Sequence, residues 1–194
     1  MKIKRVLAYI IDIFIVSIIS AAIFMLPIFK NEYNEYNEIY NEYNELLLNS
    51  GSSDVSIEQQ ENFIYNTSKS SQSLMIITSG LLFCYFGILA YILKGQTIGK
   101  KIMKIKIVSN NEKELNPNLF ILRAILVTNL IPRIISIIAL AYLKQSAWLE
   151  IENIITIISN TITFLIIGFI IFRDDERGLH DIICNTKVIS TNNK

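Results

Sequence analysis

The segment Ser73 to Leu93 reads SLMIITSGLLFCYFGILAYIL and contains no charged residue. A helix needs roughly 20 mostly apolar residues to cross the hydrocarbon core of a membrane, and this segment has that length. The whole chain of 194 residues is 52% hydrophobic and only 18% charged, and its mean hydropathy is +0.41. These values argue against a soluble domain, so the segment predicts an integral membrane protein.

Three further apolar segments are long enough to cross a membrane. They are Val6 to Phe29, Leu119 to Leu143 and Leu149 to Phe172. The sequence therefore predicts an all-α fold, a four-helix transmembrane bundle formed by a single domain over residues 1–194. The alternative for the third crossing is that 119–133 lies flat at the inner surface. We favour a crossing, because too few apolar residues would then remain before Lys144.

Basic residues are distributed unevenly around these segments. Thirteen lysines and arginines lie in residues 1–5, 94–118 and 173–194, whereas 30–72 and 144–148 together hold three. Cytoplasmic loops of membrane proteins carry an excess of such residues. We therefore expect a multi-pass protein of the cell membrane with both termini and the 94–118 connection in the cytoplasm.

The 30–72 connection is predicted to be an acidic insertion on the outer side. Residues 31–72 contain eight carboxylates and one lysine, and Asn31 to Glu45 reads NEYNEYNEIYNEYNE. The spacing of the tyrosines is that of one helical stripe, whereas asparagines and mutually repelling glutamates oppose a helix. The insertion is either an acidic face that gathers cations or a partner, or a tolerated solvated extension, which we favour. Asn49 to Ser73 is rich in Ser, Asn and Gln and predicts a loop.

Asp12 lies inside the first apolar segment, where an ionisable side chain is costly unless it is paired. Arg5 is two helical turns earlier on the same face, and Arg123 is predicted at a similar depth in the third segment. We therefore expect Arg5, Asp12 and Arg123 to form a cluster in the inner half of the membrane. Arg133 is expected near mid-depth or above, with four polar neighbours: Asn129, Ser136, Ser159 and Asn160. Pro132 removes one helical hydrogen bond, so we expect a kink whose freed backbone carbonyls help to satisfy Arg133.

Two short segments near the cytoplasmic ends are predicted to be strands. Lys104 to Val108 and Thr186 to Ile189 alternate polar and apolar residues, which is typical of half-exposed strands. Pairing of these strands beneath the bundle would bring Gly99 near Asp181. The preceding stretch GQTIGKK begins at Gly95. It is no phosphate loop, because its glycines are too close together and a lysine stands where a magnesium-binding hydroxyl is required.

Three motifs together resemble the RDD family of membrane proteins. They are Arg5 with Asp12, GQTIGKKIMKIKIV at 95–108, and RGLHDIICNTKVI at 177–189. By motif, the arginine and the two aspartates that give the family its name fall on Arg5, Asp12 and Asp181. The resemblance implies a small polytopic membrane domain, suspected in some members of ion or solute transport. It explains neither the acidic insertion nor the long fourth apolar segment.

Charged and motif residues are the candidates for function. They are Arg5, Asp12, Gly95, Thr97, Gly99, Lys100, Arg123, Arg133, His180 and Asp181. His180 beside Asp181 is either a metal or acid–base pair or, as we favour, part of a solvated charge cluster that caps a helix. No nucleophile, base and orienting group can be assembled from the sequence, so we expect no enzyme, no cofactor and no metal site.

Two functions are open. In the first, protons, monovalent cations or a small solute cross the membrane past the intramembrane charges, with Asp12 as the exchangeable site. In the second, these charges only hold the helices together, and the protein assembles with a partner or binds one. The expected contacts are the lipid bilayer, a second copy of the chain, and anionic lipid at the basic 100–106 segment. The net charge of +1 predicts no binding to nucleic acid.

Overall fold

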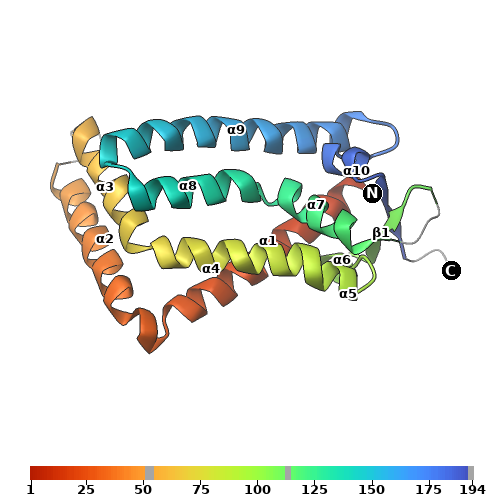
Figure 1. Cartoon of the computed structure of the whole chain (residues 1–194), viewed down its shortest axis with the longest axis horizontal. Helices are drawn as coiled ribbons and strands as arrows, with labels where there is room; N and C mark the ends of the chain where they lie inside the picture. The colour runs from red at the N-terminus through yellow and green to blue at the C-terminus, as the bar shows by residue number, and fades with distance from the viewer. Residues whose placement is uncertain (51–54, 112–114, 192–194) are drawn as a thin grey trace.

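The computed structural model of the protein describes residues 1–50, 55–111 and 115–191, so Asp54, Lys113 and Lys194 of the predicted charge distribution lie outside the described residues. Most of the chain is helical, with one small sheet (Figure 1). In chain order the elements are α1 (Lys2–Phe24), η1 (Pro27–Phe29), α2 (Lys30–Ser50), α3 (Ile57–Ser70), α4 (Gln72–Phe83), the π-helical η2 (Cys84–Leu89), α5 (Ala90–Ile92), α6 (Ile98–Ile102), β1 (Ile105–Ser109), α7 (Pro117–Val127), α8 (Leu130–Tyr142), α9 (Gln145–Phe172), α10 (Leu179–Ile183) and β2 (Thr186–Ser190).

Three helices of the described chain are long and apolar enough to cross a membrane. They are α1, the run of helix from Gln72 to Ile92, and α9. The pair α7 and α8 meets the same test when counted together, and its two helices are bent by 60°. In Figure 1, α9 lies beside α8, and α8 beside α4, while α1 packs against α4. The predicted mostly helical fold is confirmed, with three candidate membrane spans, or up to four if the bent pair is one span.

The bend between α7 and α8 lies at Thr128 and Asn129. Asn129 has a φ of 51°, a left-handed conformation that asparagine tolerates better than most residues. Pro132 has no N–H to donate to the carbonyl four residues earlier, which is that of Thr128. The Nε of Arg133 donates to this oxygen at 3.1 Å. The prediction that a carbonyl freed by Pro132 serves Arg133 is therefore confirmed.

The acidic insertion folds as two helices. The tyrosine stripe predicted from the sequence is helical, and it packs against α3. The prediction of a loop over 49–73 is wrong, because α3 occupies most of this range, although 51–54 lie outside the described residues. Ser56 begins α3 with a capping box: its hydroxyl accepts from the Gln59 N–H, and the Gln59 side chain accepts from the Ser56 N–H. Local capping therefore overrides the loop-like composition.

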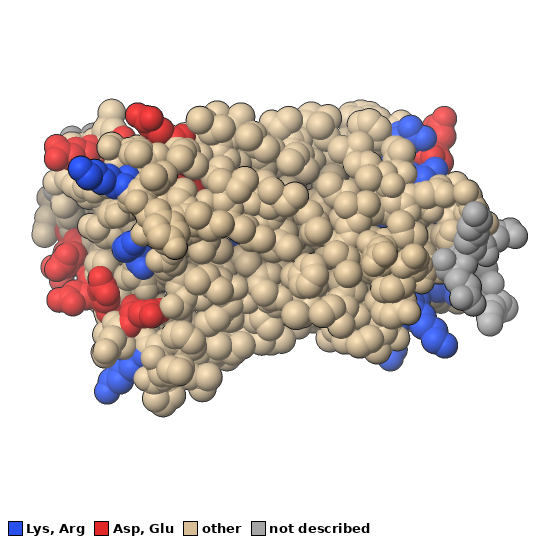
Figure 2. Space-filling view, in the orientation of Figure 1, with Lys and Arg blue, Asp and Glu red and all other residues tan. Residues whose placement is uncertain are grey.

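The insertion docks onto the C-terminal end of α8 and the N-terminal end of α9. The Lys69 ammonium donates to the Leu140 carbonyl at 2.9 Å. Tyr65 meets Trp148 edge to face with ring centroids 5.7 Å apart, and Trp148 is buried. Acidic side chains consequently gather at this end of the molecule, whereas the middle of the face drawn in Figure 2 is almost free of charge.

The two predicted strands pair at the opposite end of the bundle. β1 and β2 are antiparallel, with Ile105 opposite Ser190 and Ile107 opposite Val188. Ile105, Ile107 and Val188 are buried in one cluster with Ala8 of α1. The predicted pairing is therefore confirmed, and it places the sheet near the start of α1 (Figure 1). The motifs at 95–108 and 177–189 and Arg5 thereby meet at one end of the molecule.

Candidate functional site

Asp181 is the centre of a buried ionic cluster. Arg5 of α1 and Arg123 of α7 each donate to a different oxygen of its carboxylate, and the Gly178 N–H donates to it at 3.0 Å. Asp181 is 0% exposed. Burial alone would raise the pKa of Asp181, but Arg123 and Arg5 outweigh it, so this pKa lies well below its usual range. The cluster ties α1, α7 and α10 together.

Asp12 has a separate set of partners. Its carboxylate accepts from the hydroxyls of Tyr85 and Thr97 and, at 2.7 Å, from the Gly99 N–H. All three groups donate, which suits a carboxylate that can only accept. Asp12 is also fully buried. It therefore anchors the connection that follows the second span to the middle of α1.

The predicted cluster of Arg5, Asp12 and Arg123 is wrong. Both arginines bind the carboxylate of Asp181 and not that of Asp12. Strand pairing also predicts Gly99 near Asp181, but the direct contact of Gly99 is with Asp12. The prediction rested on the depth of residues along helices. It left out the hydroxyl and amide donors that the connecting loop supplies to Asp12.

The stretch GQTIGKK brings its backbone into close contact with β1 and α1. Gly95 has a φ of 90°, and a Cβ there would lie 2.3 Å from the Ile107 carbonyl oxygen. A Cβ at Gly99 would lie 2.2 Å from the Ala8 carbonyl oxygen, so the connection can approach α1 this closely only with glycine. Thr97 is the N-cap of α6. These residues place Lys100 on a fixed short helix beneath α1.

His180 is buried beside Asp181, so the prediction of a solvated position is wrong for both residues. The Nε2 of His180 lies 3.5 Å from Asp181 Oδ1, and Nδ1 has no hydrogen-bond partner among the described residues. Burial and the charge of Arg123 hold the pKa of His180 well below its usual range, so the imidazole is neutral. The solvated part of the predicted cluster is the exposed pair of Arg173 with Asp175. The described residues contain no group of three or more metal-ligating side chains.

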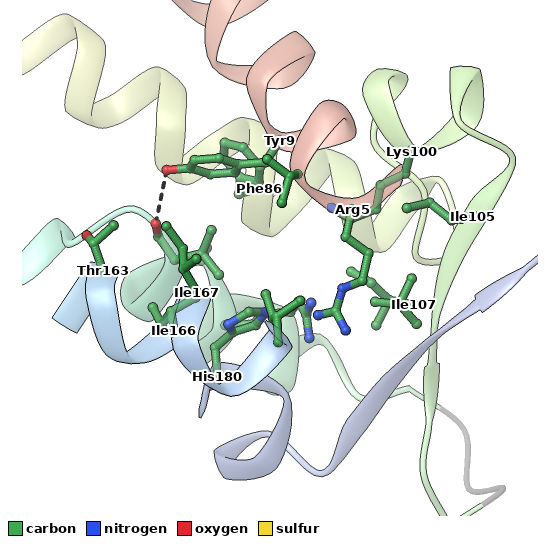
Figure 3. Close-up of a pocket in the computed structure, with 16 residues that line it drawn as sticks. Arg5, Tyr9, Phe86, Lys100, Ile105, Ile107, Thr163, Ile166, Ile167 and His180 are labelled. Atoms are coloured by element: carbon green, nitrogen blue, oxygen red, sulfur yellow. Dashed lines mark hydrogen bonds between the residues drawn. The ribbon is translucent and has the colours of Figure 1, made fainter. Parts of the chain in front are cut away.

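A cavity of about 160 Å³ lies between α1, α7 and α9 and reaches the sheet (Figure 3). Its walls are mainly aliphatic and aromatic side chains from these helices, from η2 and from the strands. Its polar end contains three basic side chains and the neutral His180. These basic residues are Arg5, Lys100 and Arg123. None of the described residues that line the cavity is acidic.

Lys100 is the basic residue of the cavity that lacks an ion pair. Its Nζ lies 3.3 Å from the Thr97 hydroxyl and 5.7 Å from the centre of the Phe86 ring. Within the described chain, no carboxylate oxygen lies within 4.0 Å of this ammonium. Burial and the nearby charge of Arg123 lower the pKa of Lys100 to about 8. An anion in the cavity would compensate both the burial of the Lys100 ammonium and its repulsion by Arg123.

The predicted candidates thus divide into three groups. Arg5, Lys100, Arg123 and His180 line the cavity, and Asp181 binds the two arginines among them. Asp12, Thr97 and Gly99 form the adjoining anchor, and Gly95 and Arg133 are outside both groups. Tyr85 was not among the predicted candidates, although a tyrosine hydroxyl in an apolar span is a possible donor to an intramembrane carboxylate. Thr186, which accepts from Arg123 at 2.6 Å, was not among them either. Nothing in the sequence marks that contact.

Comparison with known families agrees with these motifs. The sequence model of the RDD family matches residues 3–185, nearly the whole chain. The chain belongs to the RDD family. The matched range includes Arg5, Asp12 and Asp181, and it also includes the acidic insertion. A search among curated proteins and a search among solved structures find no match to this RDD family chain.

Proposed function

We propose that this RDD family protein resides in the cell membrane, binds a small amphipathic anion in the cavity and carries it across the bilayer. The observation that carries the proposal is Lys100, a half-buried ammonium that lines an apolar cavity without a carboxylate partner. A charge removed from water is costly unless another charge compensates it. Arg5 and Arg123 already share Asp181. The solute supplies the missing negative charge.

An anion suits this cavity better than a proton or a monovalent cation does. The three charged residues that line it are all basic. Asp12, which the sequence predicts as an exchangeable site, does not line the cavity, and its oxygens already accept three hydrogen bonds. We therefore assign solute recognition to Lys100, with Arg123 beside it, and an anchoring role to Asp12. No catalytic step is part of this proposal.

Octanesulfonate is a suitable transport probe, because it stays ionised and has an apolar tail. We expect purified protein in sealed vesicles to move it, and Lys100→Gln to slow the flux about tenfold, the effect of losing one charged hydrogen bond. Lys101→Gln, at the exposed neighbouring position, is the matched control. Equal octanesulfonate flux in Lys100→Gln and wild type would overturn the proposal. So would proton or monovalent cation flux that disappears in a correctly inserted Asp12→Asn variant.

A non-transporting assembly role is the second candidate. It is favoured by the Asp181 cluster and the Asp12 anchor, which join four parts of the chain and whose carboxylates have several partners each. In this case the acidic helices α2 and α3 or the basic inner loop would bind a partner. Deleting residues 31–72 should then abolish partner capture and preserve the membrane bundle. A vesicle preparation that moves no octanesulfonate but whose protein retains a partner would favour this role.

The proposed membrane orientation follows from the basic residues. We place both termini and the 94–118 connection in the cytoplasm, because thirteen of the lysines and arginines lie in those three segments. Lys101 and Lys104 are exposed there and suit contact with anionic lipid, worth about 1 kcal/mol per residue. A Cβ at Gly80 on α4 would meet nothing within 4 Å, which leaves room for a helix of a second copy. Residue labelling from each side of the membrane tests the orientation.

A further inference from the structure

The cavity is bounded by two helices that leave it open toward lipid. α1 and α9 form its sides, yet they do not make an extended helix contact with each other. Val6 and Tyr9 of α1 and Ile167 of α9 line the cavity and are 42%, 40% and 44% exposed. Figure 3 shows Tyr9 on one side and Ile166 and Ile167 on the other. The cavity lining is therefore continuous with the apolar surface that faces the bilayer.

The same gap is closed at its inner end. The Lys2 ammonium donates to the Ile171 carbonyl at 2.6 Å, and Arg5 donates to the Glu176 carbonyl. These bonds join the start of α1 to the end of α9 and to the turn that follows it. A ligand that reaches Lys100 therefore comes between the helices from the bilayer more readily than from the water below.

The charged end of the cavity lies at the level where lipid headgroups lie. Arg5 is in the first turns of α1, Lys100 follows the end of the second span, and His180 follows the end of α9. Basic pockets between membrane helices at this level bind anionic headgroups. The apolar walls extend from these groups toward the middle of the spans, where Thr163 and Val127 line the cavity. The cavity therefore has one charged end and one apolar end, as a lipid molecule does.

The cavity volume limits the size of the headgroup. A cavity of about 160 Å³ is close to the volume of about 150 Å³ that holds benzene in an engineered apolar cavity. A carboxylate or phosphate monoester with its first few carbons fits, whereas a whole phospholipid does not. The rest of the lipid must lie in the gap between α1 and α9 and in the bilayer beyond it.

We infer that the ligand is a membrane lipid with a small anionic headgroup, such as a phosphatidate. Its headgroup binds Lys100, and its chain leaves between α1 and α9 into the leaflet at the end of the molecule that holds the sheet. The inference rests on the proposed function in taking the cavity as the anion site, and it does not require transport. A free phosphate offers the same charge, but it would leave the apolar walls of the cavity facing water.

Photolabelling of the full-length protein tests this inference. The protein is placed in phosphatidylcholine nanodiscs that contain a phosphatidate with a photoreactive group on its acyl chain. Lys100→Gln removes the ammonium, and Ile167→Trp fills the gap without touching a buried charge. Lys101→Gln and Ile171→Trp are matched controls at exposed positions outside the cavity lining. The emission of Trp148, which is buried far from the cavity, reports on the fold of the two Gln variants. The midpoint of thermal unfolding, which does not depend on the number of tryptophans, reports on the fold of the two Trp variants.

The expected result is saturable labelling of α1 and α9 peptides at the gap. We expect about tenfold less labelling in Lys100→Gln and a similar loss in Ile167→Trp, with both controls unchanged and no competition by inorganic phosphate. Equal labelling in all variants, as for lipid that merely surrounds the protein, would overturn the inference. Competition by inorganic phosphate, with Ile167→Trp labelled normally, would also overturn it and assign the site to a soluble anion.

The lipid inference and the transport proposal fail in different ways. Specific labelling together with absent octanesulfonate flux supports the lipid site and contradicts the transport proposal. Flux that depends on Lys100 together with unspecific phosphatidate labelling contradicts the lipid inference and supports transport of a soluble amphipathic anion.

Discussion

Asp12 and Asp181 are buried carboxylates with different kinds of partner. Asp181 binds two guanidinium groups, so two positive charges surround one negative charge. Asp12 binds two hydroxyls and one backbone N–H, which carry no net charge. The first arrangement leaves positive potential at the cavity, and the second holds the loop that carries Lys100. Both aspartates belong to the family motifs, but only Asp181 binds side chains that line the cavity.

Replacing Asp12 should destabilise the protein through its hydrogen bonds. Asn offers one acceptor oxygen and an amide group that donates, so at least one of the three donors to Asp12 is left unpaired. We expect Asp12→Asn to lose about 3 kcal/mol of unfolding free energy in detergent. Asp174→Asn, at an exposed position, is the control and should have no effect. An Asp12→Asn variant as stable as the control would contradict the anchoring role.

The charge state of Lys100 should make anion binding depend on pH. Its pKa in the fold is lowered to about 8, below the usual value, so the ammonium opposes folding below that pH and this cost falls as the pH rises above it. An anion binds the ammonium but not the neutral amine. We expect the affinity for octanesulfonate, whose own charge does not titrate, to fall as the pH rises from about 7 to about 9. Equal affinity at both pH values, or the same slope in Lys100→Gln, would contradict this assignment.

At the scale of elements, the connection from the second span to β1 is the part that fixes the site. It turns at Gly95, caps α6 with Thr97 and contacts α1 at Gly99. The hydrogen bond from the Ile107 N–H to the Gly95 carbonyl, 2.9 Å long, attaches the turn to β1. A few residues thus join two membrane helices to the sheet.

A methyl group at Gly99 should disrupt this connection. The added Cβ would lie 2.2 Å from a backbone oxygen of α1, and backbone cannot move aside as a flexible side chain can. We expect Gly99→Ala to cost about 2 kcal/mol or more of unfolding free energy. Gly80→Ala is the matched control, because its Cβ meets nothing within 4 Å, and it should be neutral or stabilising by up to about 1 kcal/mol. Similar stability of the two variants would show that α1 and α6 are not in close contact.

Sequence patterns predicted elements better than they predicted contacts. Alternation placed both strands, and the missing N–H of Pro132 correctly indicated a carbonyl for Arg133. The helix α3 was missed because polar composition outweighed a capping signal at Ser56. The partner of Arg5 was missed because Asp181 is separated from it by nearly the whole chain, and helix depth cannot rank two such carboxylates. The choice of carboxylate for each arginine therefore required the structure.

At the scale of the whole molecule, the two ends of the bundle are closed by different elements. The acidic helices α2 and α3 dock onto α8 and α9, whereas the sheet and the ionic cluster close the other end (Figures 1 and 2). Trp148, the single tryptophan of the chain, is 1% exposed beneath α3. Its emission therefore reports on whether the insertion is docked.

Removing the insertion should expose Trp148 to water. We expect replacement of residues 31–70 by a short flexible linker to shift the emission of Trp148 to longer wavelength and to increase its quenching by iodide. Tyr43→Ala, which weakens the stacking of α2 on α3 without changing α3, should leave the quenching low. If Trp148 is equally protected with and without the insertion, α3 does not cover α9 in the membrane.

The most direct test of the anion site is a structure of the protein with a brominated octanesulfonate. We expect the sulfonate within hydrogen-bond distance of Lys100 Nζ, and the bromine, located by its anomalous scattering, between Tyr9 and Ile167. An empty cavity at a saturating concentration of this probe would contradict the assignment. A probe bound only at the exposed Lys101 would contradict it equally.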